Sequence, residues 1–327
     1  MSRTVVVTGA SAGVGRATAR AFGARGDRVA LLARSADGLA DACREVEAAG
    51  GTALAIPTDV ADAEQVEAAA AQAEQTLGPI DVWVNDAMAT IFAPVKELEP
   101  ADVRRATEVT YLGTVWGTLA ALRRMLPRDR GTIVQVGSAL SYRSIPLQAP
   151  YCGAKFAIRG FTDSLRTELL HDRSRVRVTM VQLPAVNTPQ FEWCKTLLPR
   201  HPQPVPPIFQ PEVPARAIVW AADHPRRELW VAHSAVKAIL AAKLAPSIAD
   251  RYLAKTGYRS QQTDQPVAPD RPSNLYAPVE GQHATHGRFD AQATGDSPEL
   301  WITEHRAGLA GGLAAAAAGV ALALARR

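Results

Sequence analysis

The strongest constraint on the fold is an alternation of short β-branched runs with longer helical patterns, which continues to about Val231. Such an alternation is typical of βα units in a parallel sheet. Strands are predicted at residues 4–8, 28–33, 52–56, 82–85, 132–136, 177–183 and 228–231. Helices are predicted at residues 14–25, 36–49, 63–77, 101–125, 152–170 and 212–222. The sequence therefore predicts an α/β fold in which a doubly wound parallel sheet lies between two helical layers, a three-layer sandwich.

Length and composition fit one large domain with a C-terminal extension. The chain has 327 residues, of which 47% are hydrophobic and 21% charged, close to the average for globular proteins. These values exclude a chain that is disordered throughout and a polytopic membrane protein. The formal net charge of +4 is dispersed along the chain, so charge gives no reason to expect a nucleic-acid partner.

Changes in composition divide the chain into segments. Residues 1–256 form the predicted α/β domain. Within it, residues 184–225 hold ten of the 23 prolines and follow the sixth strand, where ligands bind in open α/β sheets. We interpret this stretch as a substrate lid, with a plain connector as the alternative. Residues 257–306 are rich in Pro, Gly, Gln, Asp and Ser and are predicted to form a polar, disordered linker.

The C-terminal tail, residues 307–327, is apolar until its final two arginines. Residues 307–325 contain only Ala, Gly, Leu and Val, and 19 helical residues would extend about 28 Å, close to the hydrocarbon thickness of a bilayer. A membrane-anchoring helix is one interpretation. Ten alanines and four glycines give weak insertion energy, however, so a helix docked on protein and a low-complexity tail stay open as alternatives.

Cysteine usage and the start of the chain favour a cytoplasmic protein. The three cysteines, Cys43, Cys152 and Cys194, are far apart and form no CxxC pair. No apolar signal-peptide segment precedes the first predicted strand. The seven histidines show no ligand spacing, so no metal site is expected. Two of them, His283 and His286, are expected to be solvated in the polar segment.

A glycine-rich loop joins the first predicted strand to the first helix. Small residues in this setting let a backbone approach a pyrophosphate at the positive end of a helix. The spacing is Gly-x3-Gly-x-Gly instead of the common Gly-x-Gly-x2-Gly, so the residues alone support phosphate binding without identifying a family. The candidate cofactor-binding residues of the loop are Thr8, Gly9, Ser11, Ala12, Gly13, Val14 and Gly15.

A second pattern places a phenol and an ammonium on one helix. Tyr151 and Lys155 are at positions i and i+4 and therefore share a face. A nearby ammonium favours the phenolate and can draw the pKa of the tyrosine down from about 10, as general acid–base catalysis on an alcohol or carbonyl requires. Taken alone, Tyr-x3-Lys is common in ordinary amphipathic helices.

Together these motifs resemble the short-chain dehydrogenase/reductase family of single-domain Rossmann-type oxidoreductases. The resemblance covers about residues 3–235 and includes the Thr-Gly-x3-Gly-x-Gly loop. It implies that Asp59 and Val60 contact adenine, and that Asn85 and Ala87 contact ribose. Asp86 and Met88 depart from the family's Asn-Asn-Ala-Gly segment.

The resemblance also implies catalytic roles. Tyr151 would exchange the proton, and Lys155 would lower the tyrosine pKa and bind the nicotinamide ribose. Ser138, thirteen residues before Tyr151, would orient and polarise the carbonyl. The family's fourth catalytic residue, an Asn that seats a relay water, aligns with Thr110, and we expect the relay to survive in altered form.

The end of the second strand indicates which nicotinamide cofactor is used. A carboxylate there bonds the free 2′-hydroxyl of NAD, whereas an arginine can pair with the 2′-phosphate of NADP. The sequence has Ala33 followed by Arg34 and Ser35, so NADP(H) is predicted over NAD(H). Asp37 is the nearby residue that could reverse this preference.

Two further segments are expected around the substrate. The Pro184 turn resembles the family segment that holds the nicotinamide carboxamide, which implies contacts from Val186 and Thr188. Leu140, Tyr142 and Trp193 are predicted to face the cleft, which favours an apolar carbonyl compound. Leu147 and Phe191 fit either the cleft or packing beneath the lid.

The resemblance implies an NADP(H)-dependent oxidoreductase that moves a hydride between nicotinamide and a carbonyl or secondary alcohol. One alternative is a weakly catalytic or non-catalytic NADP(H)-binding module used for localisation or partner binding. Another is an epimerase or isomerase that recycles its cofactor. A homodimer or homotetramer is expected from the resemblance.

Overall fold

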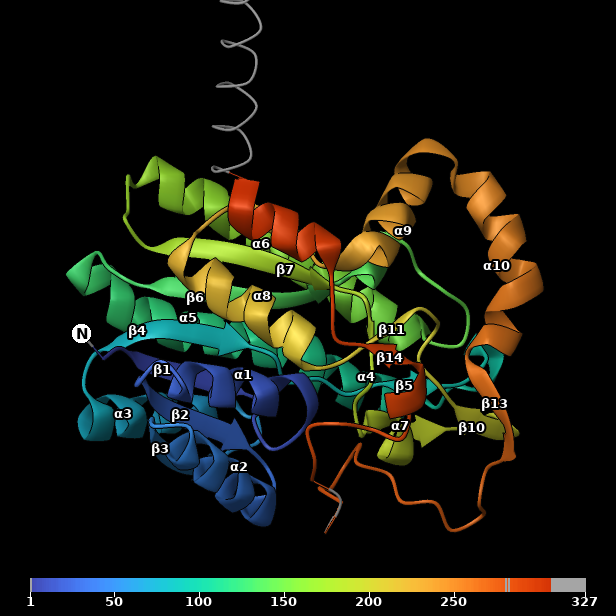
Figure 1. Ribbon diagram of the computed structural model, residues 1–327, viewed down its shortest axis with the longest axis horizontal. Coiled ribbons are helices and arrows are strands. Elements are labelled where there is room, and N and C mark those ends of the chain that lie inside the picture. Colours follow the sequence, from blue (N-terminus) through green and yellow to red (C-terminus); the bar gives the residue numbers. More distant parts are fainter. Residues whose placement is uncertain (1, 280, 282, 307–327) are drawn as a thin grey trace, which may run out of the picture.

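A seven-stranded parallel sheet forms the centre of the computed structural model, which describes residues 2–279, 281 and 283–306 (Figure 1). The strands lie in the order β12-β7-β6-β4-β1-β2-β3. Their bounds are β1 (Thr4–Thr8), β2 (Arg28–Ala33), β3 (Thr52–Pro57), β4 (Ile80–Asn85), β6 (Thr132–Ser138), β7 (Arg177–Leu183) and β12 (Glu228–Trp230). The predicted doubly wound α/β fold is confirmed, with each predicted strand within two residues of its observed ends.

Helices cover both faces of this sheet. One face carries α1 (Gly13–Gly23), α2 (Ala36–Ala48) and α8 (Glu212–Asp223). The other carries α3 (Ala63–Leu77), α4 (Pro100–Thr107), α5 (Gly113–Met125) and α6 (Ala149–His171). The strands contribute fully buried Val, Leu and Ile side chains to both layers, as a sheet covered on both faces requires. The order of the strands reverses between β1 and β4, and ligands bind beyond the carboxyl ends of strands at such a switch point.

The long helix predicted at residues 101–125 is not continuous. A π-helical turn at Glu108–Leu112 separates α4 from α5. π-Turns insert one extra residue into an α-helix and are frequent near functional sites. Helical periodicity is nearly unchanged across such a turn, so the sequence pattern does not reveal it.

The remaining elements build the rim of the cleft. Residues 184–211 form β8 (Ala185–Val186), α7 (Gln190–Trp193), β9 (Lys195–Thr196), β10 (Arg200–Pro202) and β11 (Ile208–Phe209); β9 pairs with β5 (Ile91–Phe92). After β12 come α9 (Ala232–Leu244) and α10 (Pro246–Ser260), which form a projecting hairpin (Figure 1). Single 3₁₀ turns lie at Val95–Glu97, Leu126–Arg128, Ala139–Ser141 and Asp290–Gln292.

The polar segment 257–306 differs from its prediction as a disordered linker beyond a boundary at residue 256. Helix α10 continues to Ser260, β13 (Gln262–Pro266) pairs with β10, and β14 (Ala293–Thr294) pairs with β11. Three widely spaced side chains, Leu275, Phe289 and Leu300, are buried in three different apolar clusters. Each cluster receives only one side chain from this segment. The segment therefore lacks the periodic apolar pattern by which a buried helix or strand is predicted from sequence.

The apolar tail, 307–327, lies outside the described residues. Among the residues that the structure describes, no helix combines the length and the apolar character needed to cross a bilayer.

Candidate active site

A cleft of about 730 Å³ opens at the carboxyl ends of the central strands. Its walls come from the glycine-rich loop, the ends of β2, β4 and β6, the start of α6, the segment after β7, and the α9–α10 hairpin. Apolar surface exceeds polar surface in this cleft, and several polar side chains converge at its floor. A mostly apolar concavity with a few converging polar groups is the usual form of a small-molecule site.

The glycine-rich loop has the backbone that a pyrophosphate cradle needs. Gly9 and Gly13 have φ of +72° and +56°, a region that L side chains disfavour. A Cβ on Gly15 would lie 2.3 Å from the carbonyl oxygen of Gly9, so only glycine lets the loop close on itself. The N-cap of α1, Ala12, provides no side-chain acceptor, and the first helical turn contains no acidic residue.

These features fit an anionic ligand. The first amides of a helix have no acceptor within the helix, and the helix dipole favours negative charge at that end. Gly9, Ser11, Ala12, Gly13 and Val14 all line the cleft. The predicted phosphate loop is thus placed at the cleft, while Thr8 supports it from below: its hydroxyl accepts hydrogen bonds from the Asp86 and Ala87 amides at 3.0 and 3.1 Å.

Ser138, Tyr151 and Lys155 lie together at the floor of the cleft. Ser138 ends β6, and Tyr151 is in the first turn of α6, which begins at Ala149 and not at the predicted residue 152. The Lys155 ammonium lies 5.5 Å from the centre of the Tyr151 ring and donates a 2.6 Å hydrogen bond to the Val136 carbonyl. The i,i+4 spacing therefore brings phenol and ammonium together as predicted.

Burial sets the proton affinities in this group. Loss of solvent raises the pKa of Tyr151, and hydrogen bonding with Ser138 acts in the opposite direction. Loss of solvent lowers the pKa of the buried Lys155 ammonium, and the negative charge of Asp86 opposes that fall. Burial raises the pKa of Asp86, against the opposing charge of Lys155.

Asp86 is a charged wall residue that sequence reasoning noted only as a departure. It follows β4, lines the cleft, and lies 3.0 Å from where a Gly15 Cβ would stand. Its carboxylate interacts with both Lys155 and Tyr151. An amide at this position would carry no charge, so the carboxylate changes the electrostatics of the tyrosine–lysine pair.

Arg34 and Ser35 lie at the opposite end of the cleft from Tyr151, beyond β2. The Arg34 guanidinium donates to the Asn274 and Leu275 carbonyls, and burial lowers its pKa. The Ser35 hydroxyl caps α2 by accepting from the Gly38 amide at 3.1 Å. Asp37 is exposed on α2 and is not among the residues that line the cleft.

Asp59 and Val60 line the same end of the cleft. Asp59 is held by a 2.5 Å ion pair with Arg105 and accepts from the Ala61 amide. These contacts fix the carboxylate where the resemblance implies an adenine.

Asn85 does not lie where the resemblance implies. It ends β4 with its side chain buried, and the amide nitrogen donates to Thr118 and Gln135 while the oxygen accepts from the Trp83 indole. Every polar atom of the carboxamide is thus satisfied inside the protein, and only Ala87 of the predicted ribose pair reaches the cleft. The Asn85 side chain is used instead to hold β4, α5 and β6 together, and it does not line the cleft.

Thr110 is likewise absent from the walls of the cleft. The side chain is fully buried in the π-turn, where its hydroxyl donates to the Ala89 carbonyl at 3.0 Å and accepts from the Ala89 amide at 2.9 Å. Its carbonyl accepts from Thr114. The hydroxyl fastens the backbone after β4 to α5, so the structure gives no support to Thr110 as a seat for a relay water.

The predicted substrate residues separate into two groups. Leu140 and Trp193 line the cleft, as does Phe191. Tyr142 instead turns away, with its hydroxyl 2.6 and 2.7 Å from the Glu228 carboxylate oxygens and its ring beneath Arg159. The expected cleft position of Tyr142 is wrong because an ion-assisted hydrogen bond outside the cleft holds it. Leu147 is buried beneath the lid.

Val186 and Thr188 are placed in the cleft wall after β7. The Thr188 methyl would lie 3.0 Å from a Cβ on Gly13, so the lid segment packs directly on the glycine-rich loop. Asn187 anchors this wall by donating to Gln210 and Asp290.

One wall of the cleft was missed altogether by sequence reasoning. Residues 267–279 and 283–289, here called the strap, cross the adenine end, and Asn274, Val279 and His283 line the cleft. The Ala284 carbonyl accepts from the Gly13 amide at 3.0 Å. Of the two histidines expected to be solvated, His286 is exposed and pairs with Glu212 at 3.0 Å, whereas His283 is half-buried beside Trp193. The Arg34 guanidinium also holds the strap through the Asn274 and Leu275 carbonyls. Contacts between a side chain and a distant backbone carbonyl leave no pattern in a sequence.

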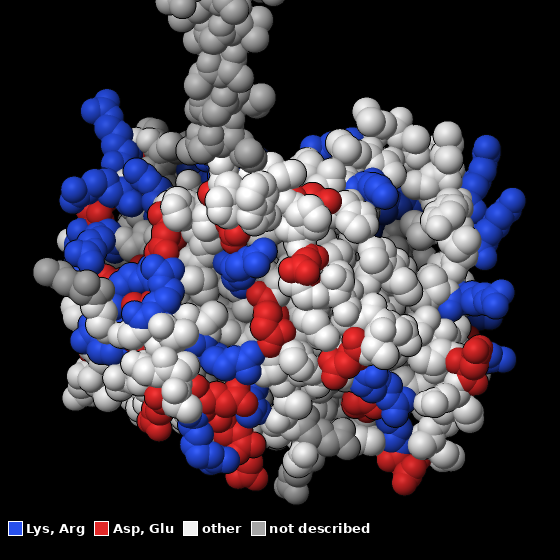
Figure 2. All heavy atoms as spheres, in the orientation of Figure 1, with Lys and Arg blue, Asp and Glu red and all other residues white. Residues whose placement is uncertain are grey.

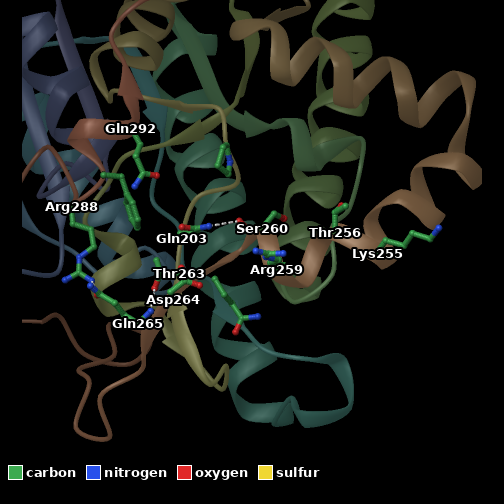
Figure 3. A pocket seen from close by; sticks show the side chains of 13 residues that line it. Gln203, Lys255, Thr256, Arg259, Ser260, Thr263, Asp264, Gln265, Arg288 and Gln292 are labelled. Atoms are coloured by element: carbon green, nitrogen blue, oxygen red, sulfur yellow. Dashed lines mark hydrogen bonds between the residues drawn. The ribbon is translucent and has the colours of Figure 1, made fainter.

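A second hollow, of about 980 Å³, lies outside this cleft between α10, β13 and residues 288–292 (Figure 3). Its lining is largely Gln, Thr, Lys and Arg, and it shares only Pro206 with the first cleft. It contains none of Ser138, Tyr151 and Lys155. Within the described part of the chain, no cluster of three or more His, Cys, Asp or Glu side chains could hold a metal ion.

Comparison with known proteins agrees with this geometry. Residues 3–195 match the model of the short chain dehydrogenase family. The uncharacterized oxidoreductase YxnA of Bacillus subtilis is 33% identical over 283 residues, which cover 86% of this chain and 80% of that protein. The 3-ketodihydrosphingosine reductase of Bos taurus is 32% identical, over 66% of this chain and 67% of that protein.

A solved structure is similar as well. An alcohol dehydrogenase from the archaeon Thermococcus sibiricus, complexed with 5-hydroxy-NADP, aligns with a TM-score of 0.61 at 28% identity, over 71% of this chain and 96% of that one. The family match spans more than half of the chain, and YxnA is more than 30% identical over more than two thirds of both chains. The chain is therefore a member of the short-chain dehydrogenase family of oxidoreductases.

Proposed function

We propose that this oxidoreductase uses NADP(H) to interconvert a carbonyl and a secondary alcohol, with Tyr151 as the general acid and base. The observation that carries the proposal is the placement of Ser138, Tyr151 and Lys155 on the floor of the cleft whose other end is the glycine-rich loop. When bound, the nicotinamide supplies or accepts the hydride. The residues of the chain handle the proton and the orientation of the substrate.

In the direction of reduction, the Tyr151 hydroxyl donates its proton to the carbonyl oxygen as negative charge develops there. The Ser138 hydroxyl donates a second hydrogen bond to the same oxygen and holds it near Tyr151. The cationic Lys155, 5.5 Å from the ring, stabilises the phenolate that remains. In the direction of oxidation the phenolate removes the alcohol proton.

The preference for NADP(H) is supported by charge at the end of β2. Ala33 offers no carboxylate to a 2′-hydroxyl, whereas Arg34 and Ser35 line the cleft with a cation and a hydroxyl. The Arg34 guanidinium is already oriented by two strap carbonyls, which reduces the side-chain entropy lost when it pairs with a phosphate. A similar structure, the Thermococcus enzyme, was solved with an NADP derivative.

Replacing Arg34 with Ala is expected to weaken NADPH binding by about tenfold to a hundredfold and to change NADH binding by less than about threefold, because only NADPH carries the 2′-phosphate. Dissociation constants for both cofactors, measured by titration of the reduced nicotinamide fluorescence, test this. Arg173→Ala, at an exposed position after α6, is the control. Equal losses for both cofactors would contradict the assignment.

The substrate is proposed to be apolar around its carbonyl. Leu140, Phe191 and Trp193 line the cleft, and alanines of α9 continue the apolar wall. The relative from Bos taurus is named as a reductase of 3-ketodihydrosphingosine.

Asp86 gives the proposal a pH signature. Its negative charge raises the pKa of Tyr151 and of Lys155. Asp86→Asn removes that charge, so both pKa values fall, and the rise of alcohol oxidation with pH is expected to move to lower pH by about 0.5–1 pH unit. The profile of kcat/KM against pH measures this shift. Asp172→Asn, at the exposed end of α6, is expected to leave the profile in place; a shift of the Asp86→Asn profile to higher pH would contradict the assigned coupling.

The experiment that tests the function is NADPH consumption across a panel of aldehydes, ketones and quinones of graded size. Consumption with apolar ketones, with one product alcohol for each NADPH, is the expected result. Tight NADPH binding without consumption of any panel member would favour the non-catalytic binding module instead. Conversion without net NADPH oxidation would favour an isomerase.

A further inference from the structure

The α9–α10 hairpin carries an unusual surface. Five large apolar side chains, Leu240, Leu244, Ile248, Tyr252 and Tyr258, are exposed on these two helices. Leu244 and Ile248 flank the turn and are 80% and 69% exposed. Leu244 ends α9 and Ile248 lies in the first turn of α10, so the two form an apolar tip at the turn of the projecting hairpin, which Figure 1 shows as a ribbon. Scattered exposed apolar residues are ordinary in proteins, but a group at a projecting tip marks an interaction site.

Cationic side chains lie along both helices of the hairpin that carries this apolar tip. Five exposed lysines and arginines lie on the hairpin: Lys237, Lys243, Arg251, Lys255 and Arg259. The hairpin has one carboxylate, Asp250, and it is 2.5 Å from Arg143. Figure 2 shows the white tip with blue side chains along its outer edge. A protein partner with an apolar patch would not require this excess of positive charge.

The base of the hairpin is fixed, whereas its tip is free. Gln261, which is buried at the end of α10, donates to the Pro146 carbonyl and accepts from Gln148. Pro146 also packs against Gly257, where a Cβ would lie 2.6 Å away. The hairpin is therefore held to the cleft at one end and presents its apolar turn to the surroundings at the other.

We infer that the α9–α10 hairpin docks on an anionic lipid bilayer, with Leu244 and Ile248 among the acyl chains and the surrounding cations at the phosphate level. Apolar side chains that enter the interface, with Lys and Arg beside them, are the two contributions that bind a helix to such a surface without spanning it. The described chain ends at residue 306, and 19 residues of only Ala, Gly, Leu and Val follow, so a second apolar segment is available to the same membrane.

The hairpin also joins this surface to the cleft. Ala241 and Tyr252 line the cleft and are exposed, so the mouth of the cleft opens beside the apolar tip. Docking would set that mouth against the bilayer. This part of the inference rests on the proposed function, and it assigns the substrate to membrane-dissolved, long-chain carbonyl compounds.

A probe on the hairpin tests docking directly. In the full-length chain with Cys43→Ser, Ile248→Cys is labelled with an environment-sensitive nitrobenzoxadiazole dye; Cys152 and Cys194 are buried. Adding vesicles of phosphatidylcholine with 30% phosphatidylserine is expected to raise the emission at least about twofold with a shift to shorter wavelength. The same dye at Glu64→Cys, on the exposed start of α3, is expected not to respond.

The outcomes separate the hairpin from the tail and from other partners. Sedimentation with vesicles while the dye at position 248 stays unchanged would mean that residues 307–325 hold the chain alone, and would overturn the inference. Emission that rises with protein concentration and not with vesicles would overturn it in favour of a contact between two copies. Arg251→Glu with Lys255→Glu is expected to weaken binding to these vesicles by at least about fivefold, and an unchanged affinity would contradict the role of charge.

The substrate class has its own test. Leu244→Asp with Ile248→Asp is expected to lower the rate with a long-chain ketone supplied in these vesicles at least about fivefold, and to leave the rate with a water-soluble ketone unchanged. Equal rates with the vesicle-borne ketone would overturn delivery from the membrane. If no ketone of either kind is reduced by the unmodified chain, the proposed function fails, and the dye result still decides docking.

Discussion

Tyr151→Phe is expected to lower kcat by at least about 1,000-fold while changing the NADPH dissociation constant by less than about threefold. The substitution removes the hydroxyl that exchanges the proton and keeps the ring that packs at the floor of the cleft. Burial raises the pKa of Tyr151, against the hydrogen bond with Ser138, so the phenol holds the proton that reduction of a carbonyl consumes. The other phenol that lines the cleft, Tyr252, stands on α10 at the exposed mouth.

Steady-state kinetics with the best ketone of the panel, together with fluorescence titration of NADPH, measure the two quantities. Tyr142→Phe is the matched control, since the Tyr142 hydroxyl is bound to Glu228 outside the cleft. It is expected to retain kcat within about threefold. A Tyr151→Phe enzyme with near-normal kcat would mean that another group, or water, moves the proton.

Gly15→Ala is expected to weaken NADPH binding by about a hundredfold or more. The added Cβ would stand 2.3 Å from the Gly9 carbonyl oxygen and 2.8 Å from the Gly9 carbonyl carbon. Both atoms belong to the backbone, so the glycine-rich loop must move by about an ångström, and a displacement of that size can cost a hundredfold in an arranged site. The added Cβ would also stand 3.0 Å from the Asp86 Oδ2 atom, a distance at which the carboxylate must shift slightly.

Gly153→Ala provides the control for that variant. Gly153 is near the start of α6, between Tyr151 and Lys155, and an added Cβ would meet nothing within 4 Å. Alanine is the better helix former by about 1 kcal/mol, so the thermal midpoint is expected to hold or rise. Titration of NADPH and thermal unfolding of both variants separate loss of the cradle from loss of the fold. Unchanged affinity in a folded Gly15→Ala protein would show that the loop does not carry the pyrophosphate.

The sheet, its flanking helices and the phosphate loop could be predicted from the sequence because each follows from local rules. Buried parallel strands show as apolar runs, amphipathic helices show as a 3.6-residue period, and the loop shows as glycines at fixed spacing. Tyr151 and Lys155 are on one helix, so their proximity also follows from spacing alone.

Other features depend on contacts between distant segments. From the sequence, Asn85 is expected to contact the cofactor. In the structure its amide nitrogen donates instead to the buried Thr118 hydroxyl and the Gln135 side-chain oxygen. Tyr142 is predicted to contact the substrate. In the structure its hydroxyl donates to Glu228, which is 86 residues further along the chain. Neither partner can be identified from one sequence, because each hydrogen bond depends on where the fold brings the two segments.

The strap is the clearest example of this limit. Its composition is that of a linker, yet single anchors such as Leu275, together with carbonyls held by Arg34 and Arg105, fix it across the adenine end of the cleft.

A homo-oligomer and an anchoring role for residues 307–325 stay predictions from the sequence.

The central claim is net hydride transfer from NADPH to a carbonyl, and transfer of deuterium tests it most directly. NADPH carrying deuterium at the reactive C4 position is incubated with the enzyme and a long-chain ketone, and the mass of the product alcohol is measured by mass spectrometry. The proposed function predicts an alcohol heavier by one deuterium at the carbinol carbon, formed in equal amount to the NADPH oxidised and absent with Tyr151→Phe. Tight binding of NADPH with no deuterium in any product would contradict it.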